Sequence, residues 1–497
     1  MSNKPNILYI FPDQHRGDAM GCVGHPSVIT PSLNRLSKES VVFERCSTNS
    51  PLCMPARASM MTGQHVSQHG IWNNNSAADP KSPSHVRNVR DAGYHTALIG
   101  KTHLYVHGGK GTALHADDNS DILKDWGFDD IHEVHGPIAS GALDSRYTDY
   151  LKGKGLLDVH RKYITDYRKE WSAGQAKPWQ EEPSPLSDKD HLDAYVGQQT
   201  VDWINNYKDD KPFYLQVLFP GPHDPFDSTK NYRALYNPDR IPVECMNAPE
   251  EPIPDYVNGV LAWSGIKDIM TRDDKQVMSA YYFAKITLID EYIGRIMDAL
   301  KNNGMADNTW IVYCSDHGEM LGDHQMSHKI VFYEGALRIP CIIRPPKGIE
   351  GWKSKALADQ LDVTATIIDI AGAEPLESSD SRSLKQQVLD GAEDPNAHKG
   401  KEYIFSEVVG FSMVRDDRYK LTVDVESLAA VEMFDLESDP DEDKNVVNEA
   451  QYESIRQELL DVNLERLKQR LDVGKFMKFL GDEKSMGVFA RFRKKAE

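Results

Sequence analysis

Short apolar runs, each bounded by turn-forming residues, alternate with segments of helical periodicity along the N-terminal part of the chain. This alternation is typical of an α/β fold built on a largely parallel central sheet. The segments that carry it are Ile7–Phe11, Ser32–Ser40, Val41–Phe43, Ala58–Thr62 and His95–Ile99, and further buried strands are predicted at Phe213–Phe219, Thr309–Cys314 and Cys341–Arg344.

A long helix is predicted between two of these strands. Apolar residues recur at helical spacing from Ser279 to Lys301, and the pattern ends before Asn302-Asn303-Gly304, a sequence typical of a helix C-terminus. We expect this helix to pack on the sheet.

Polar residues follow three of the predicted strands directly. Asp13, His223 and Asp316 each come just after an apolar run. Because active sites of open α/β sheets form at the carboxyl ends of the strands, we expect these three side chains to meet at one edge.

Other parts of the chain show a different pattern. Residues 105–195 are rich in Gly, His, Asp, Trp and Tyr with little periodicity, and are predicted to form an insertion over the site. Residues 376–400 are polar and mark a possible boundary. Beyond them, short strands at Tyr403–Val408, Ser412–Arg415, Tyr419–Val423 and Val431–Phe434, with a helix at Glu449–Gln469, predict a small antiparallel subdomain.

We therefore divide the chain into a catalytic domain at 1–385, a C-terminal subdomain at 386–475 and a tail at 476–497. The length of 497 residues exceeds that of one usual core, which agrees with this division. The tail alternates basic and apolar residues. It is interpreted either as a frayed terminus or as an arm that docks on another subunit, so a homo-oligomer is possible.

Charge and cysteine content narrow the class of protein. The formal net charge of −19 disfavours nucleic acid as a partner, although a local cationic pocket could still bind an anionic substrate. The six cysteines show no paired short spacing, which favours a reducing compartment. The run from Ile7 to Phe11 is too short for a signal peptide, and no stretch approaches the roughly 20 apolar residues of a membrane helix. We predict a cytoplasmic protein without a membrane partner.

Two strand ends carry residues that suit a divalent cation. Asp13-Gln14 follow the first strand, and Ser315-Asp316-His317-Gly318 follow another. Hard oxygen ligands favour Ca²⁺ or Mg²⁺, and an imidazole also admits Mn²⁺ or Zn²⁺. The identity of the metal stays open, with Ca²⁺ as our first expectation.

A pentapeptide, Cys53-Met54-Pro55-Ala56-Arg57, is followed by small residues and Gly63. Taken alone, Cys53 is either a buried thiol at a helix start or a functional residue. Further motifs stand in order around it: Thr30-Pro31-Ser32-Leu33-Asn34-Arg35-Leu36, Gly100-Lys101-Thr102-His103-Leu104, Ser315-Asp316-His317-Gly318-Glu319-Met320-Leu321-Gly322-Asp323-His324, Lys329, Arg338-Ile339-Pro340, and Phe434-Asp435-Leu436 with Asp439-Pro440 and Asn445. In order and spacing the chain resembles the type I sulfatases of the alkaline phosphatase superfamily, nearest to the choline-sulfatase-like and glycan-sulfatase-like bacterial branch.

This resemblance implies a large, mixed, mostly parallel sheet flanked by helices, and a smaller C-terminal α+β part with an antiparallel sheet. It implies that a formylglycine-generating enzyme oxidises Cys53 to formylglycine, whose hydrate is the nucleophile. The implied metal ligands are Asp13, Gln14, the modified residue 53, Asp316 and His317. Many sulfatases have Asp and Asn where this chain has Gln14 and His317.

The resemblance also implies catalytic roles. Arg57, one helical turn after Cys53, and Lys101 are expected to hold the hydrate, and His103 to take a proton from its second hydroxyl. His223 and Lys329 are expected to bind the transferring sulfate group and to help the leaving oxygen depart. Asn74, in an Asn triplet, matches a substrate-binding position.

The implied reaction is hydrolysis of a sulfate monoester, from a sulfated saccharide or a small alkyl or aryl ester, with release of inorganic sulfate. The alternatives are a phosphonate monoester or phosphodiester hydrolase on the same scaffold, which Lys101 and His103 disfavour, and a non-catalytic metal-binding protein. The particular ester is not fixed by the motifs. Candidates for substrate contact within the insertion are His107, His115, Trp126, His135, Arg146 and Trp179.

Overall fold

A large mixed sheet forms the centre of the computed structural model, which describes residues 4–108, 112–172, 182–376, 381–390 and 400–481. In these residues the sheet has eight strands in the order β5-β4-β6-β1-β7-β8-β2-β9. Neighbours are parallel except at β8, which runs against both β7 and β2. The strands are β5 Asp130–Glu133, β4 His95–Gly100, β6 Phe213–Leu218, β1 Asn6–Ile10, β7 Thr309–Cys314, β8 Cys341–Arg344, β2 Val41–Phe43 and β9 Trp352–Ser354.

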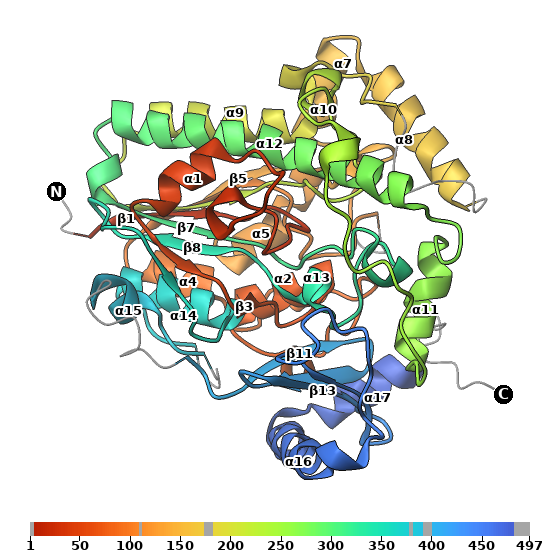
Figure 1. Cartoon of the computed structure of the whole chain (residues 1–497). Coiled ribbons are helices and arrows are strands. Elements are labelled where there is room, and N and C mark those ends of the chain that lie inside the picture. Colours follow the sequence, from red (N-terminus) through yellow and green to blue (C-terminus); the bar gives the residue numbers. More distant parts are fainter. Residues whose placement is uncertain (1–3, 109–111, 173–181, 377–380, 391–399, 482–497) are drawn as a thin grey trace.

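Helices cover both faces of this sheet (Figure 1). Leu8 and Ile10 of β1 pack on one face with α12 (Arg272–Asn302), α9 (Leu192–Asn206) and α1 (Pro31–Ser37). The alternate residues of β1 pack on the other face with α2 (Cys53–Thr62), α4 (His85–Asp91) and α14 (Gln360–Ala371). A strand buried on both faces has no polar side, which explains why these strands appear in the sequence as continuous apolar runs.

The predicted long helix is confirmed as α12, but it begins seven residues earlier than the apolar pattern. Thr271 caps it: the Thr271 hydroxyl accepts from Asp274 N, and the Asp274 carboxylate accepts from Thr271 N. This reciprocal cap satisfies backbone donors of the polar first turn, so the helix begins before the apolar pattern does.

The segment 105–195 has more regular structure than the sequence predicts. Strand β5 extends the main sheet at its edge, parallel to β4, with Ala97 opposite Asp130. Its residues, Asp-Ile-His-Glu, are mostly polar because an edge strand is partly exposed, and this hid it from a search for apolar runs. The helices of this segment are α5 Ser120–Trp126, α6 Pro137–Ser140, α7 Arg146–Gly153 and α8 Leu157–Ser172.

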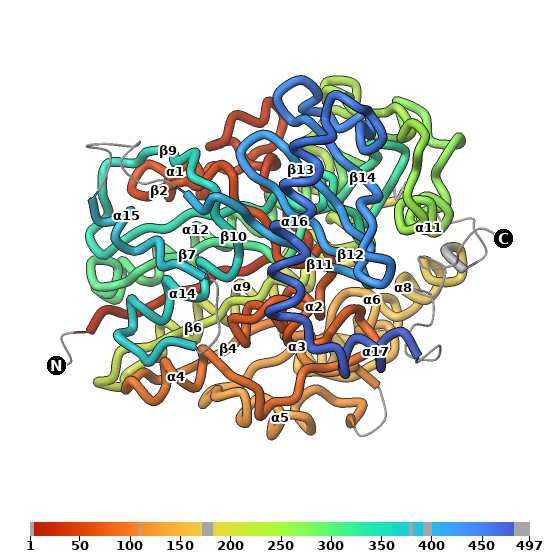
Figure 2. Tube along the Cα trace, turned by 90° about the horizontal axis from the view of Figure 1, so that it is seen from below, coloured from red at the N-terminus to blue at the C-terminus, as the bar shows by residue number. Residues whose placement is uncertain are grey.

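The predicted antiparallel C-terminal sheet is confirmed. Its strands are β11 Ile404–Val408, β12 Phe411–Arg415, β13 Tyr419–Asp424 and β14 Ala429–Asp435, in that order. Helix α16 (Glu453–Arg470) crosses one face of this sheet (Figure 2). Between the two sheets lies a polar stretch, of which residues 381–390 are described and contain α15 (Lys385–Asp390).

The last described helix, α17 (Val473–Gly481), returns to the N-terminal part of the same chain. The rings of Phe476 and Phe479 lie 5.2 and 5.9 Å from the ring of Trp72, and Lys475 Nζ donates at 2.9 Å to the carbonyl oxygen of Gln68, which lies in α3 (Val66–His69). The first residues of the predicted tail therefore dock on their own subunit, while 482–497 lie outside the described residues.

The remaining described elements connect these layers: β3 Cys46–Ser47 pairs with β10 Ala358–Asp359, and the short helices are α10 Lys230–Arg233, α11 Asp255–Ser264 and α13 Glu334–Leu337. In the described ranges we find no helix with both the length and the apolar character that a membrane span requires.

Candidate active site

Four adjacent parallel strands deliver polar residues to one edge of the main sheet. Lys101 follows β4, His223 follows β6, Asp13 follows β1 and Asp316 follows β7, and these strands are neighbours in this order. The predicted meeting of Asp13, His223 and Asp316 at one edge agrees with this topology.

Arg57 links the two carboxylates. Its Nη2 lies 2.9 Å from Asp13 Oδ2 and its Nε lies 2.9 Å from Asp316 Oδ2, and all three side chains are fully buried. A third donor, Nη1, reaches the carbonyl oxygen of Lys101 at 2.6 Å. The planar guanidinium reaches these three acceptors from three separate nitrogens, whereas a lysine has only one nitrogen to donate from.

Cys53 is the first residue of α2 and is 1% exposed. Its Sγ lies 3.1 Å from His317 Nε2 and 3.9 Å from Asp13 Oδ1. Burial and Asp13 raise the pKa of this thiol, but the positive charges of Lys329, His317 and Lys101 outweigh them and hold it well below its usual range. The site therefore favours a negative charge at position 53, aided by the start of the helix.

The donor set around Cys53 fits a divalent cation. One ligand atom from each of Asp13, Cys53, Asp316 and His317 lies within 4.8 Å of the others, and all four residues are buried. His317 Nδ1 donates to Gly318 O at 2.9 Å, which turns Nε2 toward the group. Burial and the charge of Asp13 raise the pKa of Asp316, so its ionised form is disfavoured. A bound cation would stabilise that ionised form.

Gln14 lies beside this group, but its side chain is engaged elsewhere. Lys329 Nζ donates to Gln14 Oε1, and Gln14 Nε2 donates to Glu319 Oε2. Glu319 Oε1 also accepts from His328 N at 2.5 Å. Glu319 thus joins Gln14 to the turn that carries Lys329. Sequence reasoning assigned it no role, although it stands inside the Ser315–His324 motif.

Lys101 and His103 approach Cys53 from the loop after β4. Lys101 Nζ lies 2.6 Å from Asp13 Oδ2. Burial and the charge of Lys101 lower the pKa of His103 to about 4, against the negative charge of Cys53, which raises it. A neutral imidazole next to residue 53 can accept a proton.

His223 and Asn74 line one cavity together with Lys329. His223 Nδ1 donates to Asp224 O at 2.8 Å and lies 3.1 Å from Asp224 Oδ1. Asn74 Oδ1 accepts from Met54 N at 2.9 Å, at the start of α2. Asp224 received no role from the sequence, and its only signal was its place after His223.

The substrate-contact candidates of the insertion are mostly elsewhere. Trp126 is fully buried in the core, so this prediction was wrong: its indole packs under the sheet rather than facing solvent. His115 pairs with Asp149 and Arg146 with Asp117. The rings of His107 and His135 meet edge to face at 4.5 Å, and the His107 ring lies 5.2 Å from the His103 ring. Trp179 lies outside the described residues.

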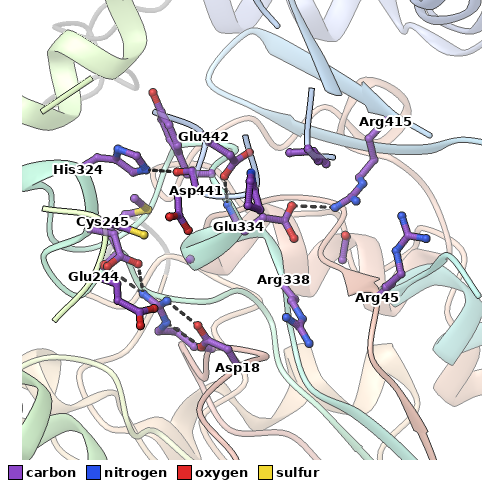
Figure 3. Close-up of a pocket in the computed structure, with 18 of the residues that line it drawn as sticks. Asp18, Arg45, Glu244, Cys245, His324, Glu334, Arg338, Arg415, Asp441 and Glu442 are labelled. Carbon is purple, nitrogen blue, oxygen red and sulfur yellow. Dashed lines mark hydrogen bonds and ion pairs between the residues drawn. The ribbon is translucent and has the colours of Figure 1, made fainter. Parts of the chain in front are cut away.

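Two cavities differ in how they relate to this site. One, of about 320 Å³, is lined by His223, Lys329 and Asn74 and so opens onto the residues around Cys53. The other, of about 610 Å³, lies against the C-terminal sheet (Figure 3). Carboxylates outnumber basic side chains along it, and Arg415 lies 2.7 Å from Glu334. The smaller cavity is therefore the better candidate for an anionic ester.

This fold and this site together define a hydrolase of the alkaline-phosphatase type. The family model "Sulfatase" matches residues 5–373, and the model "N-sulphoglucosamine sulphohydrolase, C-terminal" matches residues 322–470. The chain belongs to the sulfatase family, and is a sulfuric ester hydrolase.

Individual relatives agree with this assignment. An arylsulfatase of Clostridium perfringens is 29% identical over 489 residues, which cover 94% of this chain and 95% of the relative. Among solved structures, the phosphonate monoester hydrolase of Agrobacterium radiobacter has a TM-score of 0.74 at 23% identity, covering 94% of this chain and 96% of that one. A protein solved with its substrate D-glucosamine-2-N,6-O-disulfate has a TM-score of 0.69 at 21% identity, covering 98% and 100%. The two structures share the fold with this chain.

Proposed function

We propose that this enzyme hydrolyses a small or single-ring sulfate monoester with formylglycine at position 53 as its nucleophile. The observation that carries the proposal is the place of Cys53, at the buried start of α2 and within the group of Asp13, Asp316 and His317. A buried thiol with a purely structural role needs no such ring of carboxylates and cations.

Two groups supply chemistry that the unmodified chain lacks. The hydrate of formylglycine supplies a hydroxyl nucleophile in place of the thiol, and a divalent cation, with Ca²⁺ our first proposal and Mg²⁺ or Mn²⁺ as alternatives, supplies positive charge for an ionised oxygen. Asp13, Asp316 and His317 would hold the cation together with residue 53. The amide oxygen of Gln14 would join them if Lys329 released it.

The remaining residues bind the ester and move protons. Lys329 is 3% exposed; although burial lowers its pKa, the negative charges of Cys53 and Asp224 raise it above its usual value, so it stays a cation facing the sulfate. His223 would donate a proton to the leaving oxygen, and Lys101 would keep Asp13 ionised. Asn74 would donate its amide to the sulfate, and neutral His103 would accept the proton that is lost when sulfate is released.

The test joins a mass measurement to a rate measurement. Protein made together with a formylglycine-generating enzyme should show the aldehyde mass on the peptide with residue 53, and should release sulfate from an aryl sulfate much faster than it cleaves the matched aryl phosphonate ester. Cys53→Ser should release sulfate only at background rate. Faster cleavage of the phosphonate, or full activity of Cys53→Ser, would overturn the proposal.

The other parts of the proposal concern the protein as a whole. We propose that residues 1–385 form the catalytic domain and 386–475 a C-terminal subdomain, which the separate four-stranded sheet supports. We also propose a cytoplasmic location, supported by six cysteines that are all free. A homo-oligomer completes the proposal, together with a formylglycine-generating enzyme that binds the extended segment around Cys53 before the chain folds, since Cys53 is buried in the folded protein.

A further inference from the structure

The 320 Å³ cavity beside the candidate nucleophile limits the size of the substrate. Such a volume is near the lower end of the roughly 300–1,000 Å³ that is usual for ligand sites. Since Lys329 and His223 stand on the sulfate side, the rest of the cavity has room for one ring of the alcohol. An oligosaccharide would have to extend beyond it.

The walls of this part of the cavity are apolar and aromatic. Leu52, Ile138 and Ile330 line it together with Trp263, whose ring lies 4.6 Å from the ring of His328. A flat ring with an apolar face, from a sugar or an aryl group, can pack against such walls.

Most charged groups of the cavity are already paired. Asp224 Oδ1 lies 3.1 Å from His223 Nδ1 and 3.8 Å from His328 Nε2, and Lys329 donates to Gln14. The pKa of Asp224 is held well below its usual range, because the charges of His223 and His328 outweigh its burial. The negative charge of Asp224 is therefore already balanced by its neighbours, and it attracts a cationic substrate only weakly.

Arg168 is different. It lines the same cavity from α8 and is exposed, and within the described ranges its guanidinium has neither an ion pair nor a hydrogen bond. An unpaired guanidinium at the rim of an apolar pocket is suited to a planar or tetrahedral anion, which it can bind through two parallel hydrogen bonds.

We propose that the enzyme selects sulfate esters of a single ring that carries a second anionic group, and that Arg168 binds this group. The inference rests on the proposed function and adds the class of alcohol. An ester of a cationic alcohol, such as choline sulfate, would place a positive charge toward Arg168 and is a poor substrate.

The experiment uses two pairs of esters. Within each pair only one ester carries the second anion, and one pair is built on an aryl ring and the other on a sugar ring. The aryl pair is phenyl sulfate and 3-carboxyphenyl sulfate; the sugar pair is N-acetylglucosamine 6-sulfate and glucosamine-2-N,6-O-disulfate. For at least one pair, kcat/KM of the wild-type enzyme should be roughly tenfold higher for the ester with the second anion, the value of one charge-assisted hydrogen bond. The pair with the larger ratio identifies the ring.

Variants separate a direct contact from a general charge effect. Arg168→Gln should reduce that ratio to within about twofold, mainly through KM, and Arg168→Lys should keep part of it because the charge remains. Lys169→Gln removes the same charge from the next, exposed residue of α8 and should leave the ratio unchanged.

The outcomes distinguish the two proposals. Sulfate release without preference for the second anion, or an unchanged ratio in Arg168→Gln, would overturn the selection by Arg168 and leave the proposed function intact. If no ester released sulfate although residue 53 carried the aldehyde, the proposed function and the inference would both be wrong.

Discussion

The carboxylate of Asp224 lies 3.1 Å from Nδ1 of His223, the histidine that follows strand β6. This contact fixes the ring and leaves Nε2 as the atom that can reach a leaving oxygen. The two residues are adjacent in the sequence, so the carbonyl oxygen of Asp224 accepts a hydrogen bond from this nitrogen at 2.8 Å while the carboxylate forms an ion pair with it.

Asp224→Asn should lower kcat by roughly ten- to a hundredfold, since the amide binds the imidazole more weakly and proton donation becomes less effective. The loss should be larger for alkyl sulfates than for 4-nitrophenyl sulfate, whose leaving group needs little protonation. Rates across a series of phenols measure this. Asp239→Asn, at an exposed position, serves as the control. An equal loss for all leaving groups would contradict a role through His223.

Arg57→Lys should destabilise the protein by about 3 kcal/mol, because one ammonium nitrogen cannot replace the separate nitrogens that bind Asp13 and Asp316, and a buried carboxylate is left unpaired. Thermal and denaturant unfolding measure the change. Arg35→Lys alters an ion pair with Asp298 that is more than half exposed and should change stability by less than about 0.5 kcal/mol. Equal effects of the two substitutions would contradict the proposal that Arg57 stabilises the protein by binding both Asp13 and Asp316.

Divalent cations should raise the melting temperature of protein first treated with EDTA. A cation at a hundred times its Kd would add about 2.7 kcal/mol of stability. Asp316→Asn removes one carboxylate of the group and should abolish most of this gain, whereas Asp121→Asn, at an exposed side chain, should retain it. The ion among Ca²⁺, Mg²⁺ and Mn²⁺ with the largest shift is the best candidate. No shift with any of them would contradict the metal site.

Glu133 should make stability depend on pH. Burial raises its pKa to about 7, although Thr102 and Tyr105 donate to its carboxylate and lower it. The folded protein therefore favours the neutral carboxyl. The contribution of Glu133 to the free energy of unfolding is fully present below pH 4.5, and it falls by about 3 kcal/mol as the pH rises to 7.

Glu133→Gln keeps the shape of the side chain without its charge. The difference in unfolding free energy between this variant and the wild type should grow in favour of the variant from pH 4.5 to 7. A constant difference over this range would show that Glu133 is ionised throughout. Because Thr102 lies between Lys101 and His103, the same variant tests how firmly that loop is held.

The docking of α17 on Trp72 should contribute to stability. Phe476→Ala and Phe479→Ala each remove a buried ring and should each cost about 3 kcal/mol. Met477→Ala, on the same helix but 59% exposed, is the matched control and should change little. Similar small effects of all three would mean that α17 is not held on Trp72 in solution.

Much of the site was predictable because its residues follow elements that are encoded locally. The runs at Ile7–Phe11, Phe213–Phe219 and Thr309–Cys314 are apolar on both faces, so their burial as strands follows from composition alone, and the residue after each one must lie at a sheet edge. A helix start at Cys53 was one of the interpretations of the pentapeptide, and α2 begins there.

The partners of these residues depend on the tertiary structure. The order β4-β6-β1-β7 arises from pairings between segments up to some hundreds of residues apart, which no local pattern specifies. It decides that Lys101 meets Asp13, that Glu319 holds Gln14 and that Arg168 faces the pocket of Lys329. The sequence by itself determined which residues end the strands. Only folding decided which of them touch, because hydrogen bonds and ion pairs depend on distances that are set by long-range packing of the sheet and its helices.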